Sequence, residues 1–250
     1  LYFCLVKKEK NMEVKDKTIG GIVAEDFRTA AVFKKYGIDF CCKGNRSIEE
    51  VCAVKKKNPE DIYADLERVT QNATQNIDFK TWDLDLLSDY IEKTHHRYVE
   101  EKTIYLLQFL DKLRRVKGDR YPELIEVHEL FKQSAEDLGA HMKKEELVLF
   151  PFIRNMVEAK RRGVELPKPH FGAVENPIEM MKHEHENEGD RFEKIAQLLN
   201  QYTPPSDACN THQVTYKMLQ EFEENLHTHI HLENNILFPK AIELQKELQN

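Results

Sequence analysis

One pattern occurs twice in this chain without a gap, and it limits the folds that the chain can adopt. The copies are HMKKEELVLFP at 141–151 and HIHLENNILFP at 229–239. Each copy places a His and a Glu four positions apart, which is close to one helical turn. On a helix the two side chains leave the same face and can reach one point. The repeat therefore predicts two helices that each carry a chelating pair.

The apolar residues around each His/Glu pair indicate which way the pair faces. Positions that keep a 3-4 spacing with the pairs are apolar, as on the core-facing side of a helix. They are Phe131, Leu138, Val148 and Phe152 in the first copy, and Phe222, Leu226 and Ile236 in the second. Both pairs are expected to point into the core of a helical bundle.

The burial of two carboxylates favours a metal. A lone core histidine is more often a packing residue than a ligand, and a lone His/Glu pair is more often a weak surface contact. Two pairs together are different, because an ionised carboxylate inside a bundle is costly unless it is paired or bound to a metal. No Lys or Arg shares either stripe before Lys240. A metal is therefore the predicted source of positive charge.

Two other long helical segments are expected to supply further ligands. In the segment 177–201, His185 keeps the spacing of the apolar residues, whereas His183 shares a face with charged residues and is expected to be solvated. In the segment 84–116, His95 and His96 compete, because a step of about 100° between neighbours lets only one point well at the centre. The spacing favours His96 and leaves His95 open. The stripe that continues from His96 is Val99, Thr103, Leu106, Leu110 and Leu113.

The predicted metal ligands are His96, His141, Glu145, His185, His229 and Glu233. This set suits two metals bridged by the carboxylates, with a solvent-derived oxo or hydroxo bridge and one open position on each metal. Imidazole and carboxylate donors without thiolate suit iron or manganese more than structural zinc, and iron is the redox-active choice. The predicted cofactor is a pair of non-haem iron ions.

The chain is expected to be all-α, with an antiparallel four-helix bundle behind a small helical domain. Helical periodicity covers 84–116, 122–162, 177–201 and 212–248, and the long 163–177 loop is interpreted as an insertion. Upstream, we expect a helix over 21–36 ended by Gly37, a second helix with a Ser47/Glu50 capping box, and a third from Pro59 to about residue 71. The predicted domains are 12–71 and 81–250, joined by a polar linker at 71–80, and residues 1–11 are interpreted as an extension without function.

Composition narrows the classes of partner. Lys and Arg total 37 against 44 Asp and Glu, and the net charge of −7 argues against a nucleic-acid or anionic-membrane surface. No apolar run approaches the length of a membrane span. Five cysteines are few for a disulfide scaffold and fit a reducing compartment. We expect a cytoplasmic protein without nucleic-acid or membrane partners, and the sequence leaves open both a monomer and a homodimer.

The motifs resemble two known families. The histidine pattern is similar to the hemerythrin-like HHE domain. The segments THHRY, HMKKEE, EHENEG and HLENNILFP, together with YGIDFCCKG upstream, resemble the RIC family, the iron-sulfur cluster repair proteins of the ScdA/YtfE type. The resemblance covers residues 17–245, and the joining of a double-cysteine module to the bundle is its most specific feature. Matching the motifs places the family ligands on the six residues above, and family acids near the metals on Asp137 and Glu184.

This resemblance implies a di-iron protein that repairs iron-sulfur clusters damaged by nitric oxide or oxidative stress, with iron delivery as the expected route. It implies damaged iron-sulfur proteins as partners and an electron donor that the sequence does not identify. Cys41 and Cys42 are the predicted reactive residues, because thiols beside Lys43 are expected to have lowered pKa values and to accept iron or a disulfide-linked partner. The alternatives are an oxygen or nitric oxide binding or sensing hemerythrin-like protein, and a nitric oxide or peroxide reductase. The double-cysteine module argues against a simple gas carrier.

The remaining histidines and cysteines are interpreted as structural. The histidines expected at the surface are His128, His170, His212, His227 and His231. Cys52 and Cys209 are expected to be buried packing residues.

Overall fold

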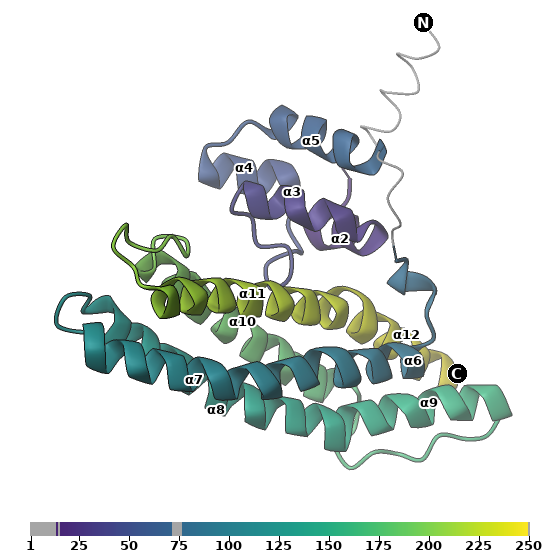
Figure 1. Cartoon of the computed structure of the whole chain (residues 1–250). Helices are drawn as coiled ribbons and strands as arrows, with labels where there is room; N and C mark the ends of the chain where they lie inside the picture. The colour runs from purple at the N-terminus through teal and green to yellow at the C-terminus, as the bar shows by residue number, and fades with distance from the viewer. Residues whose placement is uncertain (1–13, 15, 72–76, 250) are drawn as a thin grey trace, which may run out of the picture. The chain divides into compact units, whose positions relative to one another are not determined.

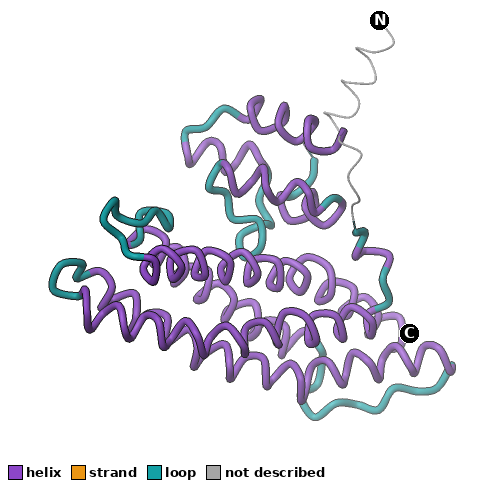
Figure 2. Tube along the Cα trace, viewed as in Figure 1, coloured by secondary structure: helices purple, strands orange, loops and turns teal. Residues whose placement is uncertain are grey.

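The computed structural model describes residues 14, 16–71 and 77–249, and each secondary-structure element in these ranges is helical (Figure 2). The all-α fold class is confirmed. Residues 1–11 and the middle of the expected linker, residues 72–76, lie outside the described part. Two compact units are formed. The first contains the described residues up to Trp82 together with Ile230–Pro239, and the second contains Asp83–His229 and the described residues from Lys240 onward.

Short helices build the first unit. They are α2 (Ile19–Glu25), η1 (Phe27–Thr29), α3 (Ala30–Lys35), α4 (Ile48–Lys55), α5 (Pro59–Gln71) and η2 (Phe79–Thr81). The capping box that begins α4 is confirmed, because the Ser47 side chain accepts from the Glu50 backbone and the Glu50 side chain accepts from the Ser47 backbone. The start of α5 at Pro59 is also confirmed.

The single helix expected over 21–36 is wrong. Asp26 interrupts it with an extended backbone, at φ −145° and ψ 99°. Its carboxylate accepts a hydrogen bond from the backbone N–H of Arg28 and so begins the short 3-10 helix η1. An aspartate that can cap a new helix competes with continuation of the old one.

Four long helical segments form a bundle, and consecutive segments run in opposite directions (Figure 1). Most of the bundle belongs to the second unit, whereas Ile230–Pro239 of the last segment belongs to the first. Their bounds are α6 (Leu84–Tyr90), η3 (Ile91–His96) and α7 (Arg97–Lys117); α8 (Glu123–Lys144), η4 (Glu145–Leu149) and α9 (Phe150–Arg162); α10 (Glu175–Leu198); and α11 (Asn210–Leu232), η5 (Glu233–Leu237) and α12 (Phe238–Gln249). These bounds match the helical periodicity of the sequence to within a few residues, and the expected bundle is confirmed. None of the described helices combines the length and the apolar character needed to cross a bilayer.

The elements η3, η4 and η5 are π-helical turns within the long segments. The first contains His95 and His96, the second begins at Glu145, and the third begins at Glu233. Such turns are rare and frequently occur at functional sites. Each one widens the helix where a predicted ligand lies, so the 3-4 spacing changes there. Val148, which the regular spacing expected in the core, is only half-buried, while Leu149 is 1% exposed.

The segment between α9 and α10 is a loop that lies against the second unit (Figure 2). The ring of Phe171 packs edge-on against Phe152, with 5.0 Å between the ring centroids. At the end of the loop the backbone N–H of Val174 donates to Gln245 Oε1 at 2.8 Å. The loop therefore packs on α9 and α12.

Candidate metal centre

The structure brings the six predicted ligands together. Each of them is no more than 3% exposed. They form two overlapping groups in which the potential ligand atoms lie within 4.8 Å of one another. The groups are His96, Glu145, His229 and Glu233, and His141, Glu145, His185 and Glu233. Both carboxylates are common to the two groups, as bridging residues would be.

Glu145 lies between histidines from two helical segments. Its Oε2 is 3.3 Å from His141 Nε2 and 3.4 Å from His96 Nε2. The Nε2 atoms of His141 and His185 are 3.0 Å apart. Glu233 follows His229 by one turn on the continuous segment α11–η5. The nitrogens and oxygens therefore converge, and they come from all four long segments of the bundle.

His95 and His96 are both buried, at 3% and 0% exposed. Only His96 belongs to a group of potential metal ligands. The Nδ1 atom of His95 lies 3.1 Å from Asn225 Oδ1, and its ring stacks on His229 with 5.8 Å between centroids. Both rings are buried in the π-helical turn η3, although only His96 lies among the potential ligands.

Alanine variants of the two histidines are expected to differ. His96→Ala should lose bound metal, because it removes a donor from the first group. His95→Ala should keep the metal but lower the free energy of unfolding by about 1–3 kcal/mol, because Asn225 loses its partner. Metal analysis and thermal unfolding of both variants test this. Metal loss in His95→Ala alone would reverse the assignment.

Two carboxylates lie behind the candidate ligands. Glu146 Oε1 is 3.0 Å from His96 Nδ1, and Glu184 Oε2 is 2.8 Å from His141 Nδ1. A carboxylate can only accept, so each Nδ1 donates and Nε2 is left for a metal. The hydrogen bond from His141, supported by Lys144, lowers the pKa of Glu184 to about 2. Sequence spacing alone did not identify Glu146, although it follows Glu145 directly.

Removing one of these carboxylates should weaken metal binding. Glu184→Ala is expected to lower the metal affinity about 10–100-fold, because partners of this kind orient a ligating histidine and raise its basicity. Glu186→Ala is the matched control, since Glu186 lies on the same helix and is exposed. Competition with a chelator of known affinity measures both variants. Equal affinities would show that Glu184 does not support His141.

The donor set fits iron. The six residues offer imidazole nitrogens and carboxylate oxygens, and no cysteine belongs to either group. This mixture suits iron or manganese. The stacking of Phe150 on His96, with 5.6 Å between ring centroids, adds an apolar wall beside the donors.

Asp137, the other acid expected near the metals, pairs with an arginine rather than with one of the candidate ligands. Asp137 forms an ion pair with Arg191 at 2.6 Å. Arg191 also pairs with Glu188, a buried acid that accepts a hydrogen bond from Ser134 at 2.5 Å. These contacts hold α8 against α10 beside the candidate centre.

Several histidines expected at the surface are buried. His212 is 0% exposed and lies between the rings of Tyr121 and Tyr216. His128 is also buried. His231 is 1% exposed, and burial lowers its pKa to about 3. The surface expectation was wrong for these three. Segments far away in the sequence contribute to the burial of two of them, because Tyr121 contacts His212, and Phe27 and Phe40 contact His231. His170 and His183 are exposed, as predicted, and His227 is half-buried.

The double-cysteine segment contains a third group of potential ligands, Asp39, Cys41 and Cys42. Cys41 is buried and Cys42 is half-buried. The expected lowering of thiol pKa is wrong for Cys41. The adjacent thiol of Cys42, burial and the carboxylate of Asp39 raise its pKa well above the usual value. Sequence reasoning missed Asp39, although an acid two positions before the thiol pair was a visible signal.

The two remaining described cysteines differ in exposure. Cys52 is buried, as predicted. Cys209 is exposed, so its expected role in packing was wrong.

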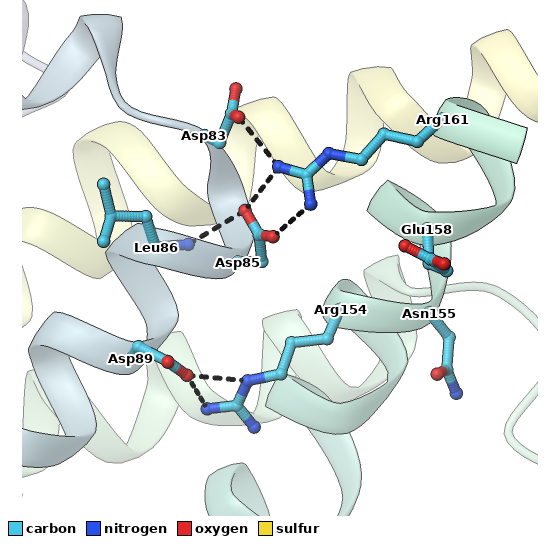
Figure 3. Close-up of a pocket in the computed structure, with 8 residues that line it drawn as sticks. All are labelled: Asp83, Asp85, Leu86, Asp89, Arg154, Asn155, Glu158 and Arg161. Atoms are coloured by element: carbon cyan, nitrogen blue, oxygen red, sulfur yellow. Dashed lines mark hydrogen bonds and ion pairs between the residues drawn. The ribbon is translucent and has the colours of Figure 1, made fainter.

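A separate hollow of about 600 Å³ lies between α6 and α9 (Figure 3). Arg161 binds Asp83 at 2.8 Å and Asp85 at 2.6 Å. Arg154 binds Asp89, and it also reaches Glu92 in the turn η3 at 2.7 Å. Both arginines of this hollow are paired with acids of α6, its N-cap and η3, so these ion pairs join two helical segments and support the turn that carries His96.

Known proteins match this chain over both the double-cysteine segment and the histidine motifs. A family model described as a hemerythrin HHE cation binding domain matches residues 87–241, and one described as a domain of unknown function matches residues 15–70. The chain is 31% identical to the iron-sulfur cluster repair protein ScdA of Staphylococcus haemolyticus, over 92% of this chain and 99% of the relative. It is 30% identical to the iron-sulfur cluster repair proteins YtfE of Enterobacter sp. and of Escherichia coli O8, with the same coverage.

Proposed function

We propose that this chain, which belongs to the family of iron-sulfur cluster repair proteins of the ScdA/YtfE type and carries a hemerythrin HHE cation-binding domain, binds iron and restores damaged iron-sulfur clusters. The observation that carries this proposal is the pair of overlapping His/Glu groups that share two buried carboxylates. Repair of a cluster that has lost iron requires a source of iron and a surface that binds the damaged protein.

The proposed resident cofactor is a pair of non-haem irons with an oxo or hydroxo bridge. His96 and His229 would hold one iron, His141 and His185 the other, and Glu145 and Glu233 both. The irons would supply redox chemistry and exchangeable iron. Glu146 and Glu184 hold His96 and His141 in the tautomer that keeps Nε2 available.

The two parts of the chain have different proposed tasks. The bundle, assigned to 81–250, would hold iron. The module at 12–71 would use Cys41 and Cys42 toward the damaged protein, which is the proposed partner together with an electron donor. Support comes from the family model that matches 15–70 separately from the cation-binding model.

The test uses the protein purified without oxygen. Metal analysis is expected to give about two irons per chain, since each of the two groups can hold one cation. The loaded protein should then restore activity to a purified dehydratase whose cluster has been damaged by nitric oxide. Reversible binding of oxygen or nitric oxide without any reactivation would instead favour a carrier or a sensor. Turnover of nitric oxide or peroxide without reactivation would favour a reductase.

A further inference from the structure

We propose that Asp39, Cys41 and Cys42 form a second cation site, separate from the His/Glu centre, which holds one Fe²⁺ ion in transit to a damaged cluster. That the ion is Fe²⁺ on its way to a damaged cluster rests on the proposed function. The site itself rests on the geometry of three side chains in the first unit.

The spacing of the donors matches one face of a tetrahedral metal site. Metal–thiolate bonds of about 2.3 Å that meet at about 109° place two sulfurs about 3.8 Å apart. The Sγ atoms of Cys41 and Cys42 are 3.6 Å apart. A carboxylate oxygen at about 2.1 Å from the same metal would lie about 3.6 Å from a sulfur. Asp39 Oδ1 is 3.3 Å from Cys41 Sγ. Cys41, Cys42 and Asp39 therefore already lie near the spacing that chelation of one metal ion requires, so the chain need not rearrange to bind it.

The backbone holds these donors in place. Asp39 Oδ1 accepts hydrogen bonds from the backbone N–H groups of Cys41 and Cys42, both at 2.9 Å. Gly20 and Gly44 let the neighbouring chain approach closely, with a hydrogen bond of 2.7 Å from Gly20 N to Gly44 O. A side chain on Gly44 would lie 2.2 Å from the carbonyl oxygen of Phe40. Hydrogen bonds and close backbone packing therefore define the conformation of the loop at the positions that carry the donors.

Exposure gives the ion a way in and out. Cys41 is buried, whereas Cys42 and Asp39 are half-buried. The three donors leave a tetrahedral ion one further position, which a water molecule or a ligand of the damaged protein can fill. An ion with three protein ligands and an open position suits transfer better than permanent storage.

The cysteine loop is also fastened to the segment that follows Glu233 within the first unit. The side-chain amide of Asn234 donates to the carbonyl oxygen of Cys41 at 3.1 Å. The next residue, Asn235, donates to the carbonyl oxygen of Phe40 at 3.4 Å. Asn234, which binds the cysteine loop, therefore directly follows Glu233, a proposed ligand of the His/Glu centre.

Cobalt distinguishes the two sites, because only the second offers sulfur. Co²⁺ is added without oxygen to the full chain already loaded with iron, in the presence of a phosphine reductant. Bound thiolate gives a sulfur-to-cobalt charge-transfer absorption that imidazole and carboxylate ligands do not give. We expect this absorption to saturate at one added Co²⁺ per chain and to disappear in Cys41→Ser/Cys42→Ser. Absence of the absorption in the native chain would overturn the site.

Asp39→Asn tests the third donor. The asparagine oxygen can still accept from the two backbone N–H groups, so the loop is expected to keep its thermal stability while the ion loses a charged ligand. We expect Co²⁺ affinity to fall at least about tenfold, because even loss of a group that only hydrogen-bonds to a ligand lowers metal affinity about 10–100-fold. Unchanged affinity would remove Asp39 from the site.

The controls are Cys52→Ser and Cys209→Ser, which remove a buried and an exposed thiol from outside the group. Both should bind Co²⁺ as the native chain does. Loss of the absorption in either one would move the site to that cysteine and overturn the proposal. The absorption requires no repair activity, so failure of this site and failure of the proposed function give different results.

Discussion

Glu145→Ala is expected to remove both metals from the bundle and the stabilisation that they give. The carboxylate belongs to both groups of donors, and its Oε2 lies within 3.4 Å of a histidine nitrogen from each. A ligand at about 100 times its dissociation constant stabilises the native state by about 2.7 kcal/mol. For a chain of this size that corresponds to about 5–10 °C in the unfolding temperature. The variant should therefore gain nothing when Fe²⁺ is added, whereas the native chain should gain this amount. Metal analysis and thermal unfolding with and without iron measure the effect.

The metal-free proteins separate binding from packing. Without iron, Glu145→Ala should lose at most the free energy of unfolding that a small cavity costs. The loss stays small because the substitution also removes a charge that is expensive to bury. Glu145→Gln keeps the volume and should respond to iron as weakly as the alanine variant. Glu136→Ala, an exposed acid on α8, is the control for the helix itself. A Glu145→Ala protein with a full pair of metals and an unchanged spectrum would exclude a bridging role.

The Cys41→Ser/Cys42→Ser variant is expected to keep the metals of the bundle and to lose repair. No cysteine belongs to the His/Glu groups, so its iron content and spectrum should match those of the native chain. Reactivation of a dehydratase damaged by nitric oxide should fall to the rate seen without the protein, because the ion would have no thiolates through which to pass. Purified components and a time course of recovered activity measure this.

Cys52→Ser serves as the matched control, because it also removes a buried thiol from the first unit. It should repair at the native rate. Full repair by the double variant would show that the thiol pair has no part in the function. Loss of its iron spectrum would show that the two proposed tasks are not separate.

Local spacing was enough to predict the four long helical segments and the candidate ligands of this chain. A His and a Glu one turn apart on an apolar stripe are a property of a single helix, so the repeat at 141–151 and 229–239 could be interpreted without a structure. The structure brings the six residues together, and their role as ligands stays a prediction. The capping box of α4 was equally local, since both of its hydrogen bonds lie within four residues.

Only the tertiary structure determined the contacts between residues of different helical segments. Sequence spacing could not show that His95 meets Asn225, a residue of another long helix, or that Glu184 of α10 lies behind His141 of α8. It also assumed a regular helical period, which the three π-helical turns break at the ligand positions.

The same distinction explains the thiols. Lys43 beside the pair suggested lowered pKa values, yet the neighbouring Cys42 thiol, burial and the Asp39 carboxylate raise the pKa of the Cys41 thiol. A pKa depends on solvation and on every charge nearby in space, and neighbours in sequence are only some of these. The sequence by itself determined which residues share a helical face, because that follows from the backbone period. Only the packed chain determined which groups from other segments meet that face and hold its donors in place.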